Sequence, residues 1–468
     1  MAGQTGFVPD PDAPALIDGV TGEVLTHGDL ARHTEAVVRE VGPRGLAFVL
    51  ADTSVATIAA YAAVRAAGHA VALLDAGLAP DLTEALLARY RPEILVMPQG
   101  ATAPEGFVER LPGIWRRPGS GPTLHPDLAV LLTTSGSTGS PKFVRLSTGN
   151  LEANTRAIIA SLGLSARDRA ITTLPLFYSY GMSVINTHVA VGGAVVVIAA
   201  SVIEPRFWDA VREHEVTFLN GVPTTFSMLK RVGLADRGVP SVRALTQAGG
   251  RMGPELIEHF ADVMADRGGE LFVMYGQTEA APRISCRPVC QTRDRVGSAG
   301  QALDGGRLEA IAPDGSVLPP GEVGEIRYTG PNVMLGYAEG PADLALGDVQ
   351  GDSLDTGDLG AVDADGFLFL RGRTKRIAKV AGMRISLDEL ESHASGPGPV
   401  AAVSAGDDGA VVFCEWPADA DVAGPQRALG RHLKLPPRSV VLRRVEALPK
   451  LANGKVDYQA LERMVQSS

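Results

Sequence analysis

Two hydrophobic patterns alternate along the first hundred residues. Short, nearly continuous apolar runs at 46–52, 69–75 and 93–98 are typical of buried strands. Between them, the Ala-rich stretch 54–68 begins with a serine suited to an N-cap, and it is expected to be a helix, as is 80–92. The resulting strand–helix–strand order predicts a parallel sheet covered by helices.

The same order of elements returns after residue 190. Strands are expected at 192–200, 217–222 and 271–276, with helices at 204–216 and 253–269. Pro223 directly follows the second of these strands and suits the first turn of a further helix. The chain is therefore expected to contain more than one βαβ region.

The pattern changes from about residue 306 onward. The stretches 321–330 and 367–372 are typical of antiparallel strands, and Asp365-Gly366 is a hairpin turn signal. A basic, Gly-punctuated connector follows at 372–386, after which Ser386 and Glu389 form a capping box that starts a helix.

These patterns predict an α/β fold with two main domains. A large N-terminal domain of parallel βαβ sheets carries a small β-barrel-like subdomain, and a small α+β domain ends the chain. The main boundary is expected at 373–375, between an N-terminal domain at 1–372 and a C-terminal domain at 376–468; that the boundary is a hinge and the C-terminal domain mobile is implied only by the family resemblance described below.

Composition narrows the class of protein. The 468 residues carry a net charge of −10, which argues against nucleic acid as a partner because phosphate binding needs concentrated positive charge. The longest apolar run, 189–203, is too short to span a bilayer, and the first twelve residues have no signal-peptide pattern. Three cysteines do not make a disulfide framework. A cytoplasmic enzyme without a membrane span is expected.

One segment, "TTSGSTGSPKF" at 133–143, has the composition of an anion site. Glycine frees consecutive backbone N–H groups, and serine and threonine add hydroxyls, so the segment can form a nest for phosphate. Its lysine does not follow a glycine, and Phe143 stands where a Walker loop needs Ser or Thr. On composition alone, a Ser/Gly-rich surface loop is the commoner explanation of such a segment.

Four further residues add to the case for a nucleotide. Glu279 follows a strand in "YGQTEA" and is a natural Mg²⁺ ligand beside a phosphate loop. Asp358 in "LDTGDLG" can accept both hydroxyls of a ribose, and Arg373 returns to the same place across the 365–366 hairpin. Lys455 follows an Asn-Gly turn in "LPKLANGKVDY", where a solvated surface lysine is the alternative.

Together the segments resemble one family over roughly residues 20–460. "TTSGSTGSPK", "LPLFYSYG" (174–181), "AGGRM" (248–252), "YGQTE", "LDTGD", "GRTKRIAKVAGMR" and "NGK" occur in the order found in the AMP-forming adenylating superfamily. That superfamily contains acyl-CoA synthetases, aryl-acid ligases, the adenylation domains of peptide synthetases and beetle luciferase. The chain is most similar in style to stand-alone acyl- or aryl-acid ligases.

The resemblance implies a two-step reaction with ATP and Mg²⁺. A carboxylate attacks the α-phosphate to give acyl-AMP and pyrophosphate, and a thiol of CoA or of an acyl carrier protein then displaces AMP. It implies phosphate contacts from Thr134, Ser135, Gly136, Ser137, Thr138, Gly139 and Lys142. It implies adenine and ribose contacts from Gly249, Gly250, Arg251, Tyr275, Gly276, Asp358 and Arg373. It implies an acid pocket lined by Tyr178, Ser179, Asn220 and Gly250.

The same resemblance assigns the catalytic and moving parts. Thr278 would contact the α-phosphate, Glu279 would hold the magnesium ion, and Lys455 would stabilise the charge that builds on the α-phosphoryl oxygens. Lys375 would be the hinge about which the C-terminal domain rotates between the two steps. Gly382 would approach the pantetheine arm in the second state, although a simple turn explains this glycine as well.

The chain also departs from the family pattern. Phe143 replaces a usual glycine after the lysine of the phosphate loop, and Tyr178 stands where many thioester-forming members have histidine. No acidic residue follows through Ala190 to grip an amino group, which disfavours an amino-acid substrate. Two alternatives to an acid–thiol ligase stay open: a ligase that passes the acyl group to nitrogen or oxygen, and an inactive nucleotide-binding homologue.

Overall fold

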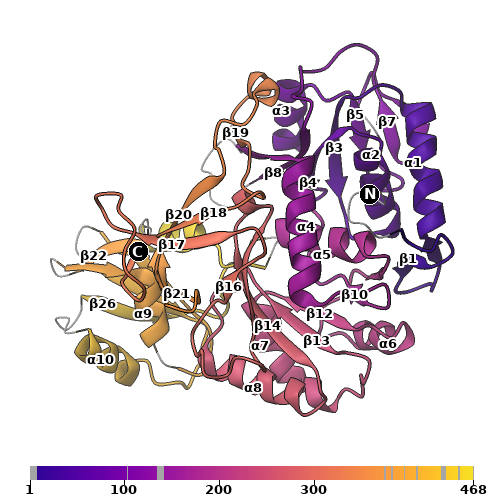
Figure 1. Ribbon diagram of the computed structural model, residues 1–468. Helices are drawn as coiled ribbons and strands as arrows, with labels where there is room; N and C mark the ends of the chain where they lie inside the picture. Colours follow the sequence, from indigo (N-terminus) through magenta and orange to yellow (C-terminus); the bar gives the residue numbers. More distant parts are fainter. Residues whose placement is uncertain are drawn as a thin grey trace. The chain divides into compact units, whose positions relative to one another are not determined.

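The computed structural model describes residues 8–102, 104–133, 142–373, 376–380, 383–394, 396–406, 409–433, 439–451 and 454–466. The chain forms two compact units (Figure 1). Unit 1 comprises 1–294, 300–307 and 329–354; unit 2 comprises 295–299, 308–328 and 355–468.

Unit 1 contains an eight-stranded sheet in the order β19-β9-β8-β4-β3-β5-β7-β6. Its strands are β3 (Leu46–Ala51), β4 (Ala70–Asp75), β5 (Ile94–Val96), β6 (Val108–Leu111), β7 (Ile114–Arg116), β8 (Leu128–Thr133), β9 (Phe143–Ser147) and β19 (Gly336–Ala338). The central strands β8, β4, β3 and β5 are parallel, as the alternating pattern of the first hundred residues predicts. The others pair antiparallel at the two edges.

A nine-stranded sheet follows, in the order β16-β15-β14-β13-β12-β10-β11-β1-β2. Its strands are β1 (Pro14–Asp18), β2 (Val24–Thr26), β10 (Arg169–Ile171), β11 (Ala194–Val197), β12 (Phe218–Gly221), β13 (Ala244–Gln247), β14 (Glu270–Gly276), β15 (Arg283–Pro288) and β16 (Gln301–Ala302). Strands β14, β13, β12, β10, β11 and β1 are parallel neighbours. The predicted strands at 192–200, 217–222 and 271–276 are β11, β12 and β14.

Eight α-helices belong to the described part of unit 1. They are α1 (His27–Val41), α2 (Val55–Ala66), α3 (Pro80–Tyr90), α4 (Thr148–Leu162), α5 (Ser179–Ala190), α6 (Pro205–Glu213), α7 (Pro223–Val232) and α8 (Pro254–Ala265), with 3₁₀ turns η1 (Leu234–Asp236), η2 (Thr278–Ala280) and η3 (Pro341–Ala345). Ser54 caps α2 through its side chain, and Pro223 is the first residue of α7, as predicted. None of the described helices is long and apolar enough to cross a membrane.

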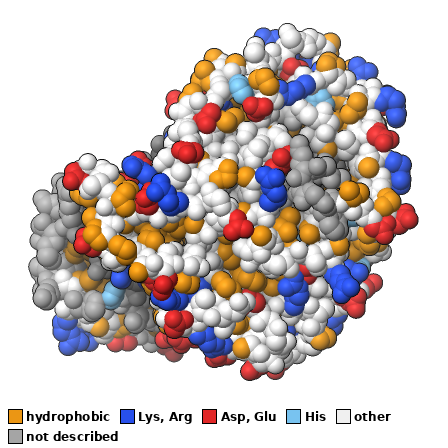
Figure 2. Space-filling model, viewed as in Figure 1, with side chains coloured by type: hydrophobic (Ala, Val, Ile, Leu, Met, Phe, Trp, Pro, Cys, Tyr) orange, Lys and Arg blue, Asp and Glu red, His pale blue; other side chains and the backbone are white. Residues whose placement is uncertain are grey.

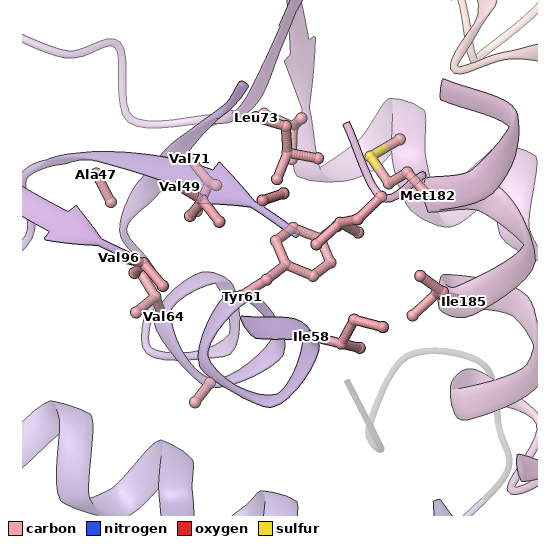
Figure 3. Close-up of a cluster of buried hydrophobic side chains, with 14 of the residues drawn as sticks. Ala47, Val49, Ile58, Tyr61, Val64, Val71, Leu73, Val96, Met182 and Ile185 are labelled. Atoms are coloured by element: carbon pink, nitrogen blue, oxygen red, sulfur yellow. The ribbon is translucent and has the colours of Figure 1, made fainter. Parts of the chain in front are cut away.

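The main core of unit 1 lies between its two sheets. Apolar residues of α2 and α5 meet residues of β3, β4 and β5 there (Figure 3). Tyr61 lies at the centre of the group with its ring fully buried, and its hydroxyl is 3.2 Å from Oδ1 of Asn186 in α5. The two sheets are therefore joined by a packed layer of helices, which holds the ends of their strands in fixed positions.

Packing on the outer face of the eight-stranded sheet explains why Phe143 replaces the glycine usual in the family. Phe143 is the first residue of β9 and is fully buried. Its ring meets the ring of Tyr90 in α3 edge-on, with centroids 5.2 Å apart, and the ring of Phe48 lies 6.3 Å away. The aromatic residue that replaces glycine is thus a packing residue under α3.

Unit 2 combines two small β regions. A four-stranded sheet has the order β17-β18-β20-β21. Its strands are β17 (Arg307–Ile311), β18 (Gly324–Thr329), β20 (Ser353–Val362) and β21 (Leu368–Arg373). The antiparallel pairing of β20 with β21 and the positive φ of Gly366 confirm the Asp365-Gly366 hairpin. This sheet stands where the sequence predicts a barrel-like subdomain.

The C-terminal part of unit 2 is α+β, as predicted. It contains β22 (Ile377–Val380), β23 (Met383–Ser386), α9 (Leu387–His393), β24 (Val400–Ser404), β25 (Ala410–Cys414), α10 (Ala423–His432), β26 (Val440–Arg444) and α11 (Tyr458–Gln466). The stretch 372–386, expected as a connector, includes the antiparallel hairpin β22–β23. Ala378 and Val380 are buried on one face, so a period-two pattern is present beneath the basic residues.

Candidate active site

Three parallel strands of the nine-stranded sheet end at the same edge. β12 pairs with β13 and β13 with β14, all parallel, so the segments that follow them leave the sheet together. These segments carry many of the predicted nucleotide and acid residues. Open α/β sheets bind ligands outside the carboxyl ends of their strands. The expectation that "YGQTEA" follows a strand end is confirmed by β14, which ends at Gly276.

Two glycines at this edge are required by the backbone. A Cβ on Gly276 would lie 2.0 Å from the carbonyl oxygen of Pro282, so no larger residue fits. Gly249 has φ +85°, a conformation that favours glycine. Its neighbour Gly250 accepts a 2.7 Å hydrogen bond at its carbonyl from the side chain of Gln247. The predicted adenine-side loop 249–251 is therefore a tight turn bound to its own strand.

The candidate metal ligand Glu279 shares a partner with the phosphate-loop lysine. The hydroxyl of Tyr337 donates to Oε1 of Glu279 at 2.8 Å. The Nζ atom of Lys142 lies 3.7 Å from the centroid of the Tyr337 ring, within cation–π distance. One tyrosine thus contacts a carboxylate through its hydroxyl and a cation through its ring. The pKa of Tyr337 is raised by burial and by the charge of Glu279, so the phenol keeps its proton and acts as the donor.

Strand pairing explains how Tyr337 reaches this place. β19 pairs antiparallel with β9, and Tyr337 lies opposite Val144 in that register. Arg145, fully buried, donates to the backbone carbonyls of Leu335, Tyr337, Leu346 and Gly347. The guanidinium therefore fixes the chain on both sides of Tyr337.

The predicted acid pocket begins at the N-terminus of α5. Tyr178 is its N-cap, and the hydroxyl of Ser179 lies 3.3 Å from the hydroxyl of Thr278. The structure thus brings one acid-pocket residue to a predicted phosphate contact. Burial raises the pKa of Tyr178, which therefore stays a neutral phenol. Asn220, at the end of β12, is 4% exposed, and its Oδ1 accepts a 2.7 Å hydrogen bond from Thr246.

The predicted ribose pair is formed within unit 2. Asp358 and Arg373 lie opposite each other in the β20–β21 register, and Nε of Arg373 donates to Oδ1 of Asp358 at 2.9 Å. Asp358 is 4% exposed, whereas 59% of the Arg373 side chain is exposed. The hairpin argument from the sequence is confirmed as a side-chain contact.

Lys455 lies in a tight turn near the end of unit 2. The carbonyl of Lys455 accepts a 2.8 Å hydrogen bond from the amide of Leu451, and Gly454 has φ +79°. The flanking residues Lys450 and Val456 form an antiparallel bridge. Asn453 of the predicted Asn-Gly turn lies outside the described residues, whereas Gly454 and Lys455 are described and directly precede the bridge residue Val456.

Several predicted site residues lie outside the described residues. They are Thr134, Ser135, Gly136, Ser137, Thr138 and Gly139 of the phosphate loop, the hinge Lys375, and Gly382. Lys142 and the strands β8 and β9 on either side of the loop are described. The roles of the residues that lie outside the described part of the chain therefore stay predictions.

Comparison with known proteins identifies the family. A family model described as "AMP-binding enzyme" matches residues 8–338, which is more than half of the chain. The chain belongs to the AMP-binding enzyme family. The match covers all of the unit 1 site residues named above.

Curated relatives in this family are CoA ligases. A sulfoacetate–CoA ligase of Cupriavidus necator is 33% identical over 316 residues, which cover 67% of this chain and 61% of that protein. A 2-succinylbenzoate–CoA ligase of Bacillus subtilis is 32% identical over 266 residues, 56% of this chain and 52% of that protein. The chain spans about half to three fifths of the length of the curated relatives it matches.

Solved structures in this family have the same fold. An o-succinylbenzoate CoA synthetase of Bacillus subtilis in complex with its acyl-adenylate intermediate gives a TM-score of 0.76 at 23% identity, covering 97% of this chain and 96% of that one. ATP-bound MatB from Rhodopseudomonas palustris gives a TM-score of 0.79 at 23% identity, and the match covers 99% of each chain. The α/β fold class predicted from the sequence is confirmed.

Two residues of this AMP-binding enzyme were missed by the sequence reasoning. Tyr337 and Arg145 join strands that are far apart in the chain, and only the β9–β19 register brings them to Lys142 and Glu279. The sequence offers one signal for these two residues: each is a polar residue in a mainly apolar strand. Such a signal does not distinguish them from other polar residues at strand edges.

Proposed function

We propose that the chain is an AMP-forming acid–thiol ligase. It joins a carboxylic acid to the α-phosphate of ATP, releases pyrophosphate, and passes the acyl group to the pantetheine thiol of CoA. In the first step a carboxylate oxygen forms a bond to the α-phosphorus while the bond to the pyrophosphate oxygen breaks. In the second step the thiol sulfur attacks the acyl carbon and AMP leaves.

One observation supports the proposal most strongly. Glu279 and Lys142 meet on Tyr337 at the carboxyl end of β14, beside the Ser179–Thr278 contact. A carboxylate for a metal, a cation for phosphate and a hydroxyl for the α-phosphate are thus grouped at one strand end. Transfer of a phosphoryl-type group is catalysed mainly by such positioned charges.

Magnesium fits the donor set of Glu279. Mg²⁺ is commonly held by one or two carboxylates together with substrate phosphates and water. Among the residues that the structure describes, no lysine or arginine forms a salt bridge with Glu279, so its negative charge is available for a cation. A bound Mg²⁺ would neutralise charge on the ATP phosphates. Tyr337 would orient the carboxylate that holds it.

We propose the roles that the family resemblance implies for the remaining nucleotide residues. Asp358 and Arg373 would bind the ribose, and the turn at 249–251 with Tyr275 would enclose the adenine. Lys455 would enter the site during adenylation and stabilise the charge on the α-phosphoryl oxygens. With ATP and CoA as substrates, we also propose a cytoplasmic location.

The two ends of the predicted hinge are bound to different parts of unit 2. Arg373 is paired with Asp358 in β20, whereas Arg376 is bound to Asp388 and Glu391 of α9. These contacts support a hinge at Lys375 between domains 1–372 and 376–468. A Lys375→Pro variant should retain adenylation and lose thioester formation, because proline restricts the backbone rotation that a domain swing needs. Equal losses in both steps would argue against a hinge there.

The proposal is tested by two assays on one panel of acids. ATP–pyrophosphate exchange measures acyl-AMP formation, and product analysis after addition of CoA measures thioester formation. Exchange followed by an acyl-CoA product is the expected result. Exchange without a thioester from CoA or a carrier protein would favour a nitrogen or oxygen acceptor. ATP binding without exchange for any acid would indicate an inactive homologue.

A further inference from the structure

A buried arginine stands beside the acid pocket. Arg283, the first residue of β15, is 3% exposed. Its guanidinium lies 4.6 Å from the ring centroid of Tyr180, Nη1 is 2.7 Å from Sδ of Met274, and Nη2 donates to the hydroxyl of Ser183 at 3.3 Å. Within the described residues no carboxylate forms a salt bridge with it. Neutral partners offset only part of the cost of burying a charge.

The other fully buried arginines of unit 1 have oxygen as their only hydrogen-bond partner type, although Nη1 of Arg287 is buried without a hydrogen-bond partner in the structure. Arg145 donates to four backbone carbonyls, and Arg287 donates to the hydroxyl and the carbonyl of Thr292. Arg283 has a sulfur, a hydroxyl and an aromatic face instead. All of these partners are neutral, so the positive charge of Arg283 is not compensated by them, and an anion would be a stronger partner than any of the three.

The backbone of Arg283 is held firmly in place. Asn154 of α4 accepts a hydrogen bond from its amide at 3.1 Å and donates to its carbonyl at 2.7 Å. In the β14–β15 register Arg283 lies opposite Gly276, two residues before Thr278. The guanidinium is thus attached close to the reacting end of the proposed acid site.

A second donor lies on the same wall. The Tyr180 hydroxyl is 2.7 Å from Oγ1 of Thr246, which donates to Oδ1 of Asn220. The Nδ2 atom of Asn220 is buried and has no hydrogen-bond partner in the structure. A buried N–H without an acceptor costs free energy, so Asn220 is also suited to a partner from outside the chain. Arg283 and Asn220 are joined through Tyr180 and Thr246.

We propose that Arg283, assisted by Asn220, binds a second anionic group on the acid substrate. The substrate class is then a dianionic acid, in which one carboxylate is adenylated and a carboxylate or sulfonate at the other end pairs with the guanidinium. The fork of N–H donors in arginine matches both groups geometrically. This inference rests on the proposed function, and it names the kind of acid that the ligase takes.

Pyrophosphate exchange with matched pairs of acids tests the inference. Each pair contains a dicarboxylic or sulfo-carboxylic acid and an analogue whose second anionic group is replaced by a methyl or carboxamide group. Wild-type enzyme should prefer the dianionic member. Arg283→Met should lower kcat/KM for that member roughly 100-fold, in the range seen for truncated buried charge pairs, and should raise it for the methyl analogue. Comparison of the dicarboxylic with the sulfo-carboxylic acids then separates the two anion types.

A matched control separates a specificity role from a structural one. Arg287 lies on the same strand and is 1% exposed; its Nε and Nη2 donate to Thr292, its Nη1 has no hydrogen-bond partner in the structure, and no contact joins it to Tyr180, Ser183 or Asn220 in the described residues. Arg287→Met should leave the preference ratio between paired acids unchanged, even if it lowers the melting temperature. Arg283→Lys, which keeps the charge, should recover part of the preference for dianionic acids. A wild-type preference for the neutral-ended analogues would overturn the inference, as would an equal loss for both members in Arg283→Met.

Failure of the inference can be distinguished from failure of the proposed function. Calorimetric binding of the same dianionic acids, with wild type and Arg283→Met compared, does not depend on catalysis. Binding that requires Arg283 without any exchange would overturn the ligase assignment but support the anion site. Exchange with acids whose binding is indifferent to Arg283 would support the ligase and overturn the anion site. Absence of both would overturn both.

Discussion

The hydroxyl of Tyr337 lies 2.8 Å from Oε1 of Glu279, although the two residues are 58 positions apart in the chain. The same ring faces Nζ of Lys142 at 3.7 Å. One tyrosine side chain therefore contacts both the carboxylate proposed to bind the metal ion and the lysine proposed to bind phosphate. Acidic and basic side chains are interspersed over the face of the molecule shown in Figure 2.

Tyr337→Phe tests whether this hydroxyl orients the carboxylate. The variant keeps the ring under Lys142 and removes only the donor to Glu279. A hydrogen bond to a charged group contributes about 1.5–3 kcal/mol, so pyrophosphate exchange should fall roughly 10- to 100-fold. The concentration of Mg²⁺ needed for half-maximal exchange should rise, because a freely rotating carboxylate holds the ion less well. Exchange rates measured across a Mg²⁺ titration provide the readout.

Tyr61→Phe is the matched control for that experiment. Tyr61 is also a buried tyrosine with a hydrogen-bonded hydroxyl, but its partner is Asn186 in the core between the sheets. This variant should lower stability slightly and leave the Mg²⁺ dependence unchanged. If Tyr337→Phe behaved in the same way, Tyr337 would be a packing residue only.

Lys455→Ala tests the assignment of the catalytic cation. Loss of the ammonium should reduce acyl-AMP formation by at least roughly 100-fold, since removal of one stabilising donor from a transition state has effects of this order. Thioester formation from supplied acyl-AMP and CoA should be largely retained. Lys450→Ala is the matched control. Lys450 is also a lysine and pairs with Val456, the residue after Lys455, in the antiparallel bridge. This variant should leave both steps nearly unchanged. Near wild-type exchange in Lys455→Ala would refute the assignment.

Local patterns were sufficient for those parts of the site that lie within short segments. The Asp358–Arg373 contact could be predicted because a two-residue turn signal sets the register of the β20–β21 hairpin. The position of Glu279 could be predicted because an apolar strand precedes it directly. In both cases only a few residues separate the sequence pattern from the site residue whose position it predicts.

Contacts between distant segments could not be predicted in this way. The Tyr337–Glu279 bond depends on the pairing of β19 with β9, strands that are separated by nearly two hundred residues. The hairpin β22–β23 was missed because basic residues obscure the apolar alternation that buries Ala378 and Val380. The role of Phe143 depends on its ring contact with Tyr90 of α3, which the sequence does not predict. Each case requires the tertiary packing that a single sequence does not display.

A partly buried charge network connects the elements of the C-terminal part of unit 2. Arg376 is bound to Asp388 and Glu391 of α9, donates to the carbonyl of Ala402 at 2.9 Å, and lies 3.9 Å from the ring centroid of Tyr458. Burial raises the pKa of Glu391, and the guanidinium opposes that shift. The network connects α9, β24 and α11 immediately after the predicted hinge.

Arg376→Met should destabilise this part of the protein, because it leaves two partly buried carboxylates without their cation; breaking a fully buried pair costs about 3–5 kcal/mol, which is the upper bound here. Denaturant unfolding followed by the fluorescence of Trp416, which is 4% exposed in the same region, measures the loss. Arg327→Met breaks an exposed pair with Asp355 in the same unit and should have a much smaller effect on stability, because solvent screens exposed ion pairs. Equal effects of the two substitutions would show that the network is not a major source of stability.

Acid sensitivity is expected from a histidine in the core of unit 1. Burial lowers the pKa of His188 from 6.5 to about 4. Its Nδ1–H donates to the carbonyl of Val184, while Nε2 is buried without a hydrogen-bond partner near the ring of Phe218. Of the nearby charged groups, Asp168 favours the protonated imidazole and Arg243 opposes it. A proton on Nε2 would therefore enter an apolar site with little compensation.

The sign of the pH effect follows from these two pKa values. Below pH 6.5 the unfolded chain binds a proton at His188 and the folded chain does not, so stability falls as the pH drops from about 6.5 towards 4. His188→Gln should make the free energy of unfolding less dependent on pH in this window, by up to about 3 kcal/mol across it. His33→Gln, at an exposed position in α1, should leave the slope unchanged. Denaturant unfolding at several pH values between 4 and 7 gives the slopes directly. An identical slope in wild type and His188→Gln would mean that other groups, such as the buried His69, control the acid response.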